Sequence, residues 1–224
     1  MLEKISCILL VLTLCLVAAP TDTRQFSKVI LLEETSETSA NASVGDLIGD
    51  GYPDLIAANR KSPSYVCMND GTGGFKDAGI VMIPSESATT IVPADFNGDG
   101  FIDLAIPHRD GGQSLLFFND GKGGFAEKKP FGPENTSARA AAAGDLNSDR
   151  RIDLVVGDDK RGSLVYLNKG QGEFGDGFQI SDPSLAVGAI AIGVMNRDGA
   201  YDIVMGYATA PGSVFFNKGQ GVDF

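Results

Sequence analysis

The sequence predicts an all-β protein in which one four-stranded unit recurs four times. Three observations support this: an acidic motif recurs at a nearly constant spacing, a glycine-rich turn motif keeps the same spacing, and the apolar runs between them are short. The chain has 224 residues, 29 of them glycine, so tight turns are frequent. A sheet of four short strands cannot bury its own apolar faces, so neighbouring units must stack. Four strands in about fifty residues is the size of a β-propeller blade.

The composition excludes several classes of protein. The chain carries 18 lysines and arginines against 29 acidic residues, for a net charge of −11. With 43% hydrophobic and 21% charged residues, it has the composition of a folded globular protein rather than a disordered one. A chain this acidic is repelled by phosphate backbones, so no nucleic-acid partner is expected.

The first nineteen residues predict a secretory signal peptide. Lys4 is followed by fifteen uncharged residues that end in the small residues Val17-Ala18-Ala19, which is typical of a signal with its cleavage site. Fifteen residues are too few to cross a bilayer as a helix, so no transmembrane span is expected. Pro20 is unfavourable after a cleavage site, which leaves the position of the cut open. The protein is expected to be secreted or displayed at the cell surface, with the repeats in residues 20–224.

Two motifs recur with one period. The acidic motif occupies residues 46–54, 95–103, 145–153 and 194–202. An Asn-x-Gly-x-Gly turn occupies residues 69–75, 119–125, 168–174 and 217–224. Two unrelated signals at the same pitch indicate a true repeat.

The elements of each unit follow one order. A strand such as Thr89–Pro93 precedes the acidic loop, and strands such as Leu104–Ile106 and Leu115–Phe118 follow it, separated by a polar turn. After the Asn-x-Gly turn, the last strand is predicted to open at the phenylalanine, for example Phe125. Short apolar runs bounded by Gly, Asp and Asn are typical of strands and not of helices.

The acidic loops predict calcium sites. The second copy offers side-chain oxygens at positions 1, 3, 5 and 9, from Asp95, Asn97, Asp99 and Asp103. Hard oxygens at alternate positions suit calcium, and clustered carboxylates without a cation would repel one another. The alternative is that Asp, Asn and Gly merely favour turns. The constant pitch favours the metal, and the absence of Cys and His from the loops disfavours zinc.

The four copies differ as candidate sites. The third copy keeps the full set: Asp145, Asn147, Asp149 and Asp153. However, it has Arg150 in place of a turn glycine, which adds a positive charge. In the first copy Ile48 replaces the third ligand, and weaker binding is expected from the remaining three: Asp46, Asp50 and Asp54. In the fourth, Val194 removes the first carboxylate, so that copy is expected to be structural only.

These motifs resemble the FG-GAP and VCBS repeats of integrin-α-like β-propellers. The resemblance rests on the loop Asp-Phe-Asn-Gly-Asp-Gly-x-x-Asp at 95–103 and on the Asn-x-Gly-x-Gly-x-Phe turns, and it covers the chain from about Phe26 to Phe224. It implies a calcium-stabilised propeller at or outside the cell surface, with ions bound in the second and third loops. Members of this family commonly have seven blades, whereas this chain has four repeats.

The number of blades stays open at the level of the sequence. Phe26 precedes Asp46 by the same interval by which Phe75 precedes Asp95, so residues 25–32 predict one more strand. That strand could complete the fourth unit and close a four-bladed ring, or the chain could be a fragment of a larger ring. An unclosed ring would offer an open edge for self-association through strand pairing.

The turns opposite the acidic loops suggest a ligand-binding surface. Five basic residues gather in them: Arg60, Lys61, Arg109, Lys160 and Arg161. One interpretation is a cationic rim that recognises a carboxylate or sulfate on a glycan or a partner protein. The alternative is ordinary solvated loop charge.

No motif predicts catalysis. His108 is the only histidine, no serine lies in a nucleophile-elbow motif, and Cys67 lies in an apolar strand where a packed, inert thiol is expected. The predicted function is a non-catalytic, calcium-binding β-propeller module for adhesion or for binding a protein or glycan ligand. The alternative is the propeller part of an exported polysaccharide lyase or hydrolase whose catalytic region lies outside this chain.

Overall fold

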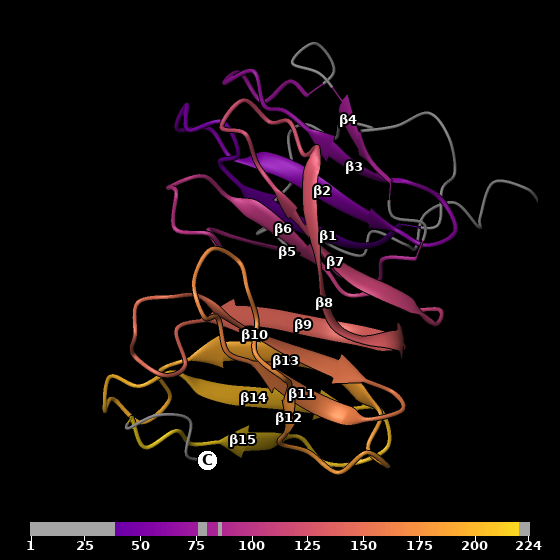
Figure 1. Cartoon of the computed structure of the whole chain (residues 1–224), viewed down its shortest axis with the longest axis vertical. Coiled ribbons are helices and arrows are strands. Elements are labelled where there is room, and N and C mark those ends of the chain that lie inside the picture. The colour runs from indigo at the N-terminus through magenta and orange to yellow at the C-terminus, as the bar shows by residue number, and fades with distance from the viewer. Residues whose placement is uncertain (1–38, 76–79, 85–86, 220–224) are drawn as a thin grey trace, which may run out of the picture. The chain divides into compact units, whose positions relative to one another are not determined.

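A computed structural model of the chain describes residues 39–75, 80–84 and 87–219. All regular elements in this part are strands, and they form four antiparallel sheets in which strands adjacent in sequence are paired (Figure 1). The described residues contain no helix of the length and apolarity needed to cross a membrane. The expectation of an all-β repeat protein is confirmed. The predicted signal peptide and the predicted strand at 25–32 lie outside the described residues.

The four sheets have the same strand order. The first contains β1 (Ser39–Gly45), β2 (Asp54–Asn59), β3 (Ser64–Cys67) and β4 (Ile80–Ile83). The second contains β5 (Val92–Ala94), β6 (Asp103–Ile106), β7 (Gly112–Phe118) and β8 (Glu127–Thr136). The third contains β9 (Ala138–Gly144), β10 (Asp153–Asp158), β11 (Gly162–Tyr166) and β12 (Phe178–Gln179). The fourth contains β13 (Val187–Gly193), β14 (Asp202–Tyr207) and β15 (Ser213–Phe215).

The order of loops inside each unit agrees with the prediction, and two strand boundaries do not. Each acidic loop joins the first strand to the second, and each Asn-x-Gly turn follows the third. The last strand does not open at the phenylalanine, because Phe125 is buried in the cluster between the first two sheets and β8 begins only at Glu127. The strand expected at Thr89–Pro93 is shorter, since β5 spans Val92–Ala94.

Consecutive sheets pack face to face through buried side chains. In β10, Leu154 and Val156 join a cluster with the second sheet, whereas Val155, between them, joins a cluster with the fourth. This is the alternation that a strand buried on both faces requires. The first strands of successive sheets are also neighbours, β1 beside β5, β5 beside β9 and β9 beside β13. Stacked four-stranded units with adjacent innermost strands have the arrangement of propeller blades.

One side-chain hydrogen bond recurs at every junction between sheets. The Nδ2 atoms of Asn119, Asn168 and Asn217 donate to main-chain carbonyl oxygens in the preceding sheet at 2.6, 2.8 and 2.6 Å. The acceptors are the second residues of the acidic loops: Leu47, Phe96 and Leu146. The Asn-x-Gly motif is therefore more than a turn, because it fastens each sheet to the loop of the sheet before it.

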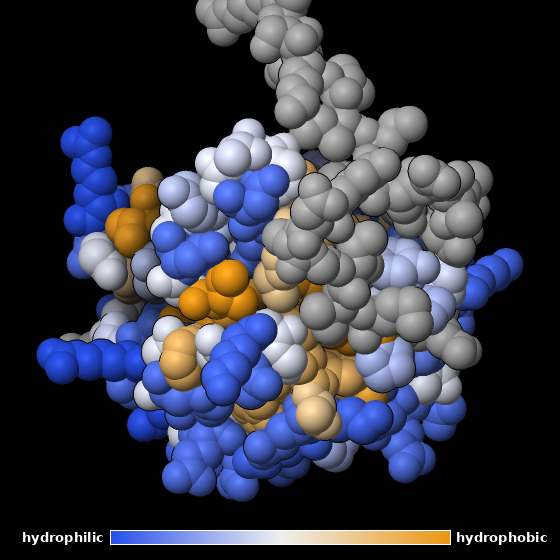
Figure 2. Space-filling model, turned by 90° about the horizontal axis from the view of Figure 1, so that it is seen from above, coloured by the Kyte–Doolittle hydropathy of each residue, from blue (hydrophilic) through white to orange (hydrophobic). Residues whose placement is uncertain are grey.

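The surface visible in Figure 2 is mainly hydrophilic. Within the coloured part of this view, hydrophilic residues cover most of the surface, and apolar residues occupy a smaller area near its centre. Cys67 is buried in β3, as the sequence predicts.

Candidate functional site

The four acidic loops share one backbone conformation. Loop positions four and six have positive φ in every copy, between 62° and 92°: Gly49 and Gly51, Gly98 and Gly100, Ser148 and Arg150, Arg197 and Gly199. Glycine adopts this conformation readily, whereas any other residue in it raises the energy of the folded state by about 1–2 kcal/mol. The third loop, with Ser148 and Arg150 at these positions, therefore carries strain that the second loop does not have.

The ninth residue of each loop is a buried aspartate that holds three segments together. Asp103 accepts the main-chain N–H of Phe96 on Oδ2 at 3.0 Å and that of Asn119 on Oδ1 at 2.9 Å. The carboxylate at the start of β6 thus joins the acidic loop to the Asn-x-Gly turn. The same pair of bonds, at 2.8–2.9 Å, is made by Asp54, Asp153 and Asp202. All four side chains are inaccessible to solvent.

Burial perturbs two of these aspartates. Desolvation raises the pKa of Asp103 and that of Asp153 to about 6. The charge of Asp99 adds to this effect at Asp103, while the N–H groups of Asn119 and Phe96 oppose it. The two N–H donors therefore stabilise the charged form of a carboxylate that burial destabilises.

The other predicted ligands of the second loop lie within the same turn and are bonded to it. Asp95 accepts the N–H groups of Gly98 and Gly100 at 2.7 and 2.9 Å. Asn97 donates from Nδ2 to Asp99 at 2.8 Å, and the Asp99 N–H donates to Asn97 Oδ1 at 2.9 Å. In the part of the chain that the structure describes, no three acidic, histidine or cysteine side chains form a cluster that could hold a metal.

The donor set of the second loop nevertheless fits calcium in kind. It consists of three carboxylates and one amide carbonyl, all hard oxygens. The third loop repeats this set, but the Arg151 guanidinium bonds Asp149 and also donates to the Asn168 carbonyl at 2.7 Å. At the corresponding place the second loop has Phe101, which brings no charge. The second loop is thus the better candidate for a cation.

The first and fourth loops lack one oxygen each, as the sequence indicates. In the first, Asp46 accepts the N–H groups of Asp50 and Gly51 at 3.1 and 2.9 Å, while Ile48 packs against the apolar core. In the fourth, Asn196 and Asp198 bond each other, and Val194 is exposed where the other loops have an aspartate. Neither loop offers the full oxygen set of the second.

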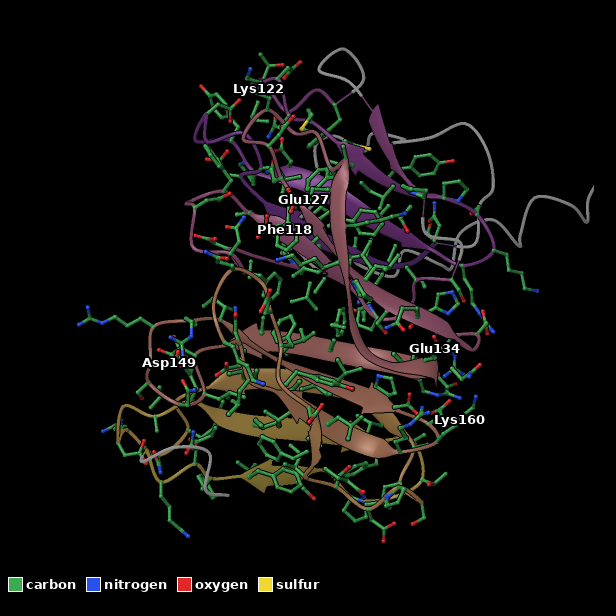
Figure 3. All side chains as sticks on the ribbon, viewed as in Figure 1. Phe118, Lys122, Glu127, Glu134, Asp149 and Lys160 are labelled. Atoms are coloured by element: carbon green, nitrogen blue, oxygen red, sulfur yellow. The ribbon has the colours of Figure 1, made fainter. Side chains whose placement is uncertain are left out.

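The basic turns opposite the acidic loops form a ladder of ion pairs between sheets. Asp149 and Lys160, labelled in Figure 3, mark the two opposite ends of the third sheet. Arg60 makes a bidentate pair with Asp110 of the next sheet, at 2.8 and 3.2 Å. Arg109 pairs with Asp159, again fifty positions further along the chain, through one bond from a guanidinium nitrogen to Oδ2 at 2.5 Å.

The ladder changes the interpretation of the basic residues. Hydrogen bonds from Arg60 and Ser87 hold the pKa of Asp110 well below its usual range. Desolvation would raise the pKa of Asp159, but Arg109 and Arg139 outweigh it and hold that pKa below the usual range too. Arg60 and Arg109 therefore already have acidic partners in the next sheet, which favours the alternative of ordinary loop charge for these two residues. Sequence comparison within the chain could have found this, since both pairs follow the repeat period.

A groove between the second and third sheets was not predicted. It has a volume of about 570 Å³ and is lined by β8 from one side and by β11 and the segment 174–177 from the other. Phe131, Tyr166 and Phe174 form its aromatic part, with ring centroids 5.7–6.5 Å apart. Its polar side chains are Gln113, Arg161 and Asp176. The groove is lined by residues of two repeats, so no single sequence motif predicts it. The segment Pro130–Pro133 in β8, which lines the groove, is the one local sequence feature that could have pointed to it.

One buried polar group points into this groove. Tyr166 is only 2% exposed, and its hydroxyl has no hydrogen-bond partner among the described residues. Burial raises the pKa of Tyr166 to about 12, so the hydroxyl keeps its proton. A side chain at Gly132, where φ is 63°, would come within 2.8 Å of the hydroxyl oxygen. Glycine at this position therefore leaves the space beside the hydroxyl open.

His108 and the nearby Asp110 make contacts that hold the fold. His108 accepts the N–H of Gly112 on Nδ1 at 2.9 Å, within the turn between β6 and β7. Asp110, near it in sequence, is held by Arg60 and Ser87. Both residues therefore serve the turn and the ion-pair ladder.

Comparison with known proteins agrees with this architecture. The model of the FG-GAP-like repeat matches residues 46–106 and 95–156. A search of curated proteins found no match. Among solved structures, BBS1N in complex with ARL6DN has a TM-score of 0.56 at 14% identity, covering 84% of this chain and 55% of that chain. A lectin of Agrocybe aegerita that recognises non-reducing terminal N-acetylglucosamine has a TM-score of 0.50 at 19% identity, covering 79% and 52%.

These likenesses concern the fold, and the chain spans about half the length of the solved structures that it matches. The matched segments contain the first three acidic loops with the strands and turns between them. The four sheets repeat this arrangement, including the aspartate clamp and the asparagine bond between sheets. The chain is an FG-GAP repeat protein.

Proposed function

We propose that this protein is a non-catalytic, ligand-binding β-propeller module that is stabilised by calcium and works outside the cell or at its surface. The observation that carries ligand binding is the groove between the second and third sheets. Its volume of about 570 Å³ lies in the range of small-molecule sites. Aromatic walls with a few polar groups are also the usual lining of such sites.

The chemistry of the groove favours a glycan as the ligand. A sugar ring presents hydroxyl groups along its edge and an apolar face of C–H groups. The Tyr166 hydroxyl can donate to a sugar oxygen, and Asp176 is an exposed acceptor near it. Gln113 directs its amide N–H groups to the carbonyls of Phe131 and Gly132, which leaves its own carbonyl oxygen as a second acceptor. The Agrocybe aegerita lectin, which has a similar fold, recognises a terminal sugar and supports this choice.

Calcium would act on the same module by holding its loops. The second loop, with Asp95, Asn97, Asp99 and Asp103, is proposed as the principal site, and the third loop as a weaker one. Bound calcium supplies positive charge to a group of carboxylates that otherwise repel one another. The protein's own part is to place these oxygens through the positive-φ turns and the buried aspartate clamp. The predicted signal peptide supports an extracellular location, where free calcium is abundant enough for a weak site.

Glycan binding can be tested directly with the full chain. A glycan array identifies the sugar, and isothermal titration with that sugar then compares the parent with Tyr166→Phe. Loss of one hydrogen bond is expected to weaken binding about tenfold. The melting temperature should stay unchanged, because the hydroxyl has no partner among the described residues. Tyr52→Phe, which alters an exposed tyrosine of the first loop, is the matched control and should bind normally. An array without any bound glycan, or equal affinities for both variants, would refute the proposal.

A further inference from the structure

The outer face of the fourth sheet carries the same kind of apolar residues that are buried between the other sheets. No sheet in the described part of the chain packs against this face. At loop position two, Leu47, Phe96 and Leu146 are at most 2% exposed, because the following sheet covers them. At the same position of the fourth loop, Met195 is 50% exposed. A large apolar side chain is retained here although no sheet in the described part of the chain covers it.

The third strand of each sheet shows the same contrast. Val66, Leu116 and Val165 are fully buried against the next sheet, whereas Val214 in β15 is 45% exposed. Met68 and Phe118 are 6% exposed, whereas Phe216 is 51% exposed. We call Met195, Val214 and Phe216 the fourth-sheet face. Exposed apolar residues in one group usually mark a site of association.

A polar part of the interface is also open at this face. In the first three sheets, the carbonyl of loop position two accepts Asn Nδ2 from the next sheet. The Met195 carbonyl occupies the same position, and no asparagine within the described ranges donates to it. The fourth-sheet face therefore offers both the apolar surface and the acceptor that each internal junction uses.

The complementary half of this interface lies on the first sheet. Asn69 donates from Nδ2 to the Pro53 carbonyl of its own sheet at 3.0 Å, but has no inter-sheet acceptor in the described part of the chain. Gly123 and Gly172, two later turn glycines, lie against Met68 and Phe118 of the preceding sheet. The equivalent Gly73 has no atom of the described residues within 4 Å of the place where a Cβ would be.

We propose that a second copy of this chain docks its Asn69–Gly74 turn onto the fourth-sheet face, so that two chains associate head to tail. The internal junctions show that these two halves fit: asparagine reaches the carbonyl of loop position two, and the turn glycine covers the apolar side chain below it. Such a contact is heterologous, and two chains would contribute eight sheets, within the four to eight blades of known propellers. The proposal is independent of the ligand in the groove.

Light scattering or equilibrium sedimentation of the full chain tests this association. Between about 1 µM and about 1 mM, the mean mass should rise from 23.4 kDa toward twice that value. Two variants each damage one half of the contact. Phe216→Arg places a charge on the fourth-sheet face, and Gly73→Asn adds a side chain where the turn must lie close to the partner. Asparagine tolerates positive φ better than most residues, so the turn should survive.

The decisive measurement mixes the two variants. Each variant alone should stay monomeric, whereas the mixture should form a one-to-one complex, because one chain retains an intact turn and the other an intact face. Phe101→Arg is the matched control and should associate like the parent, since it alters an exposed aromatic at a place where the third repeat already has Arg151. A monomeric parent at every concentration, variants that associate normally, or a mixture that stays monomeric would each overturn the proposal. A Phe216→Arg chain that is monomeric like its parent but melts earlier would show instead that the chain covers this face itself.

Discussion

Replacing Asp202 by alanine tests whether the ninth loop position holds the fold together without a metal. The fourth loop suits this test because Val194 stands in place of the first carboxylate. Asp202 accepts the N–H of Met195 at 2.8 Å and that of Asn217 at 2.9 Å. Alanine leaves both donors without their partner, and Asn217 is buried.

The expected loss of stability comes from the two N–H groups that no longer have an acceptor. A buried N–H without an acceptor costs about 1–3 kcal/mol. The Asn217 N–H should carry the full cost, while water can reach the partly exposed Met195 N–H and reduce its share. We therefore expect Asp202→Ala to lower the free energy of unfolding by about 2–4 kcal/mol.

Asp198→Ala in the same loop is the matched control. Asp198 also accepts an N–H, that of Ala200 at 2.8 Å, but it is exposed, so water can replace the bond. The expected change is within about 0.5 kcal/mol. Urea unfolding followed by far-ultraviolet circular dichroism, with a chelator present, measures both variants. Equal losses in the two variants would refute the distinction between a buried clamp and an exposed turn residue.

Three further predictions concern the loops and the ladder. Chelation of calcium should lower the melting temperature of the parent. Asp99→Ala should weaken calcium binding at least about tenfold, as measured by titration calorimetry. A parent whose melting temperature does not change with calcium would contradict this. Combined Ser148→Gly and Arg150→Gly relieves the strain at two positions of positive φ, but each new glycine costs about 0.5–1 kcal/mol of backbone entropy, so the net stabilisation should be about 1 kcal/mol. A measured loss of stability would contradict the assigned strain. Arg109→Ala should destabilise the chain by about 1 kcal/mol at pH 7, since its partner Asp159 is mostly buried and has a lowered pKa. A lowered carboxyl pKa stabilises fully above the unfolded value near 4 and loses this effect as the pH falls through the lowered pKa of the folded state, so the difference between Arg109→Ala and the parent should shrink on acidification. A difference that persists after Asp159 is protonated would exclude the ion pair as its cause.

The loops show how far sequence analysis reaches. The position of every acidic loop, its place between the first and second strands and the special role of its turn glycines could be predicted, because they depend on residues close together in the chain. The role of Asp103 as a clamp could not, since its partner Asn119 lies sixteen residues away and meets it only after β6 and β7 have paired.

The ion-pair ladder and the groove could not be predicted from neighbouring residues either, because both form between different sheets. Arg60 and Asp110 look like unrelated loop charges until the first two sheets stack, and then the repeat period brings them within 2.8 Å. Tyr166 looks like any strand residue until β8 of the preceding sheet forms the other wall of the groove. Contacts of this kind depend on which sheet faces lie together.

The sequence by itself determined that this protein is a fourfold repeat of short strands with acidic loops at a constant pitch, because strands and turns follow from neighbouring residues. Only the tertiary structure decided how the repeats are joined, through the asparagine bonds, the buried aspartates and the ion-pair ladder, because these contacts cross from one unit to the next. The same stacking created the groove and left Met195, Val214 and Phe216 exposed. A periodic sequence specifies identical surfaces, and the arrangement of the units decides which of them are buried.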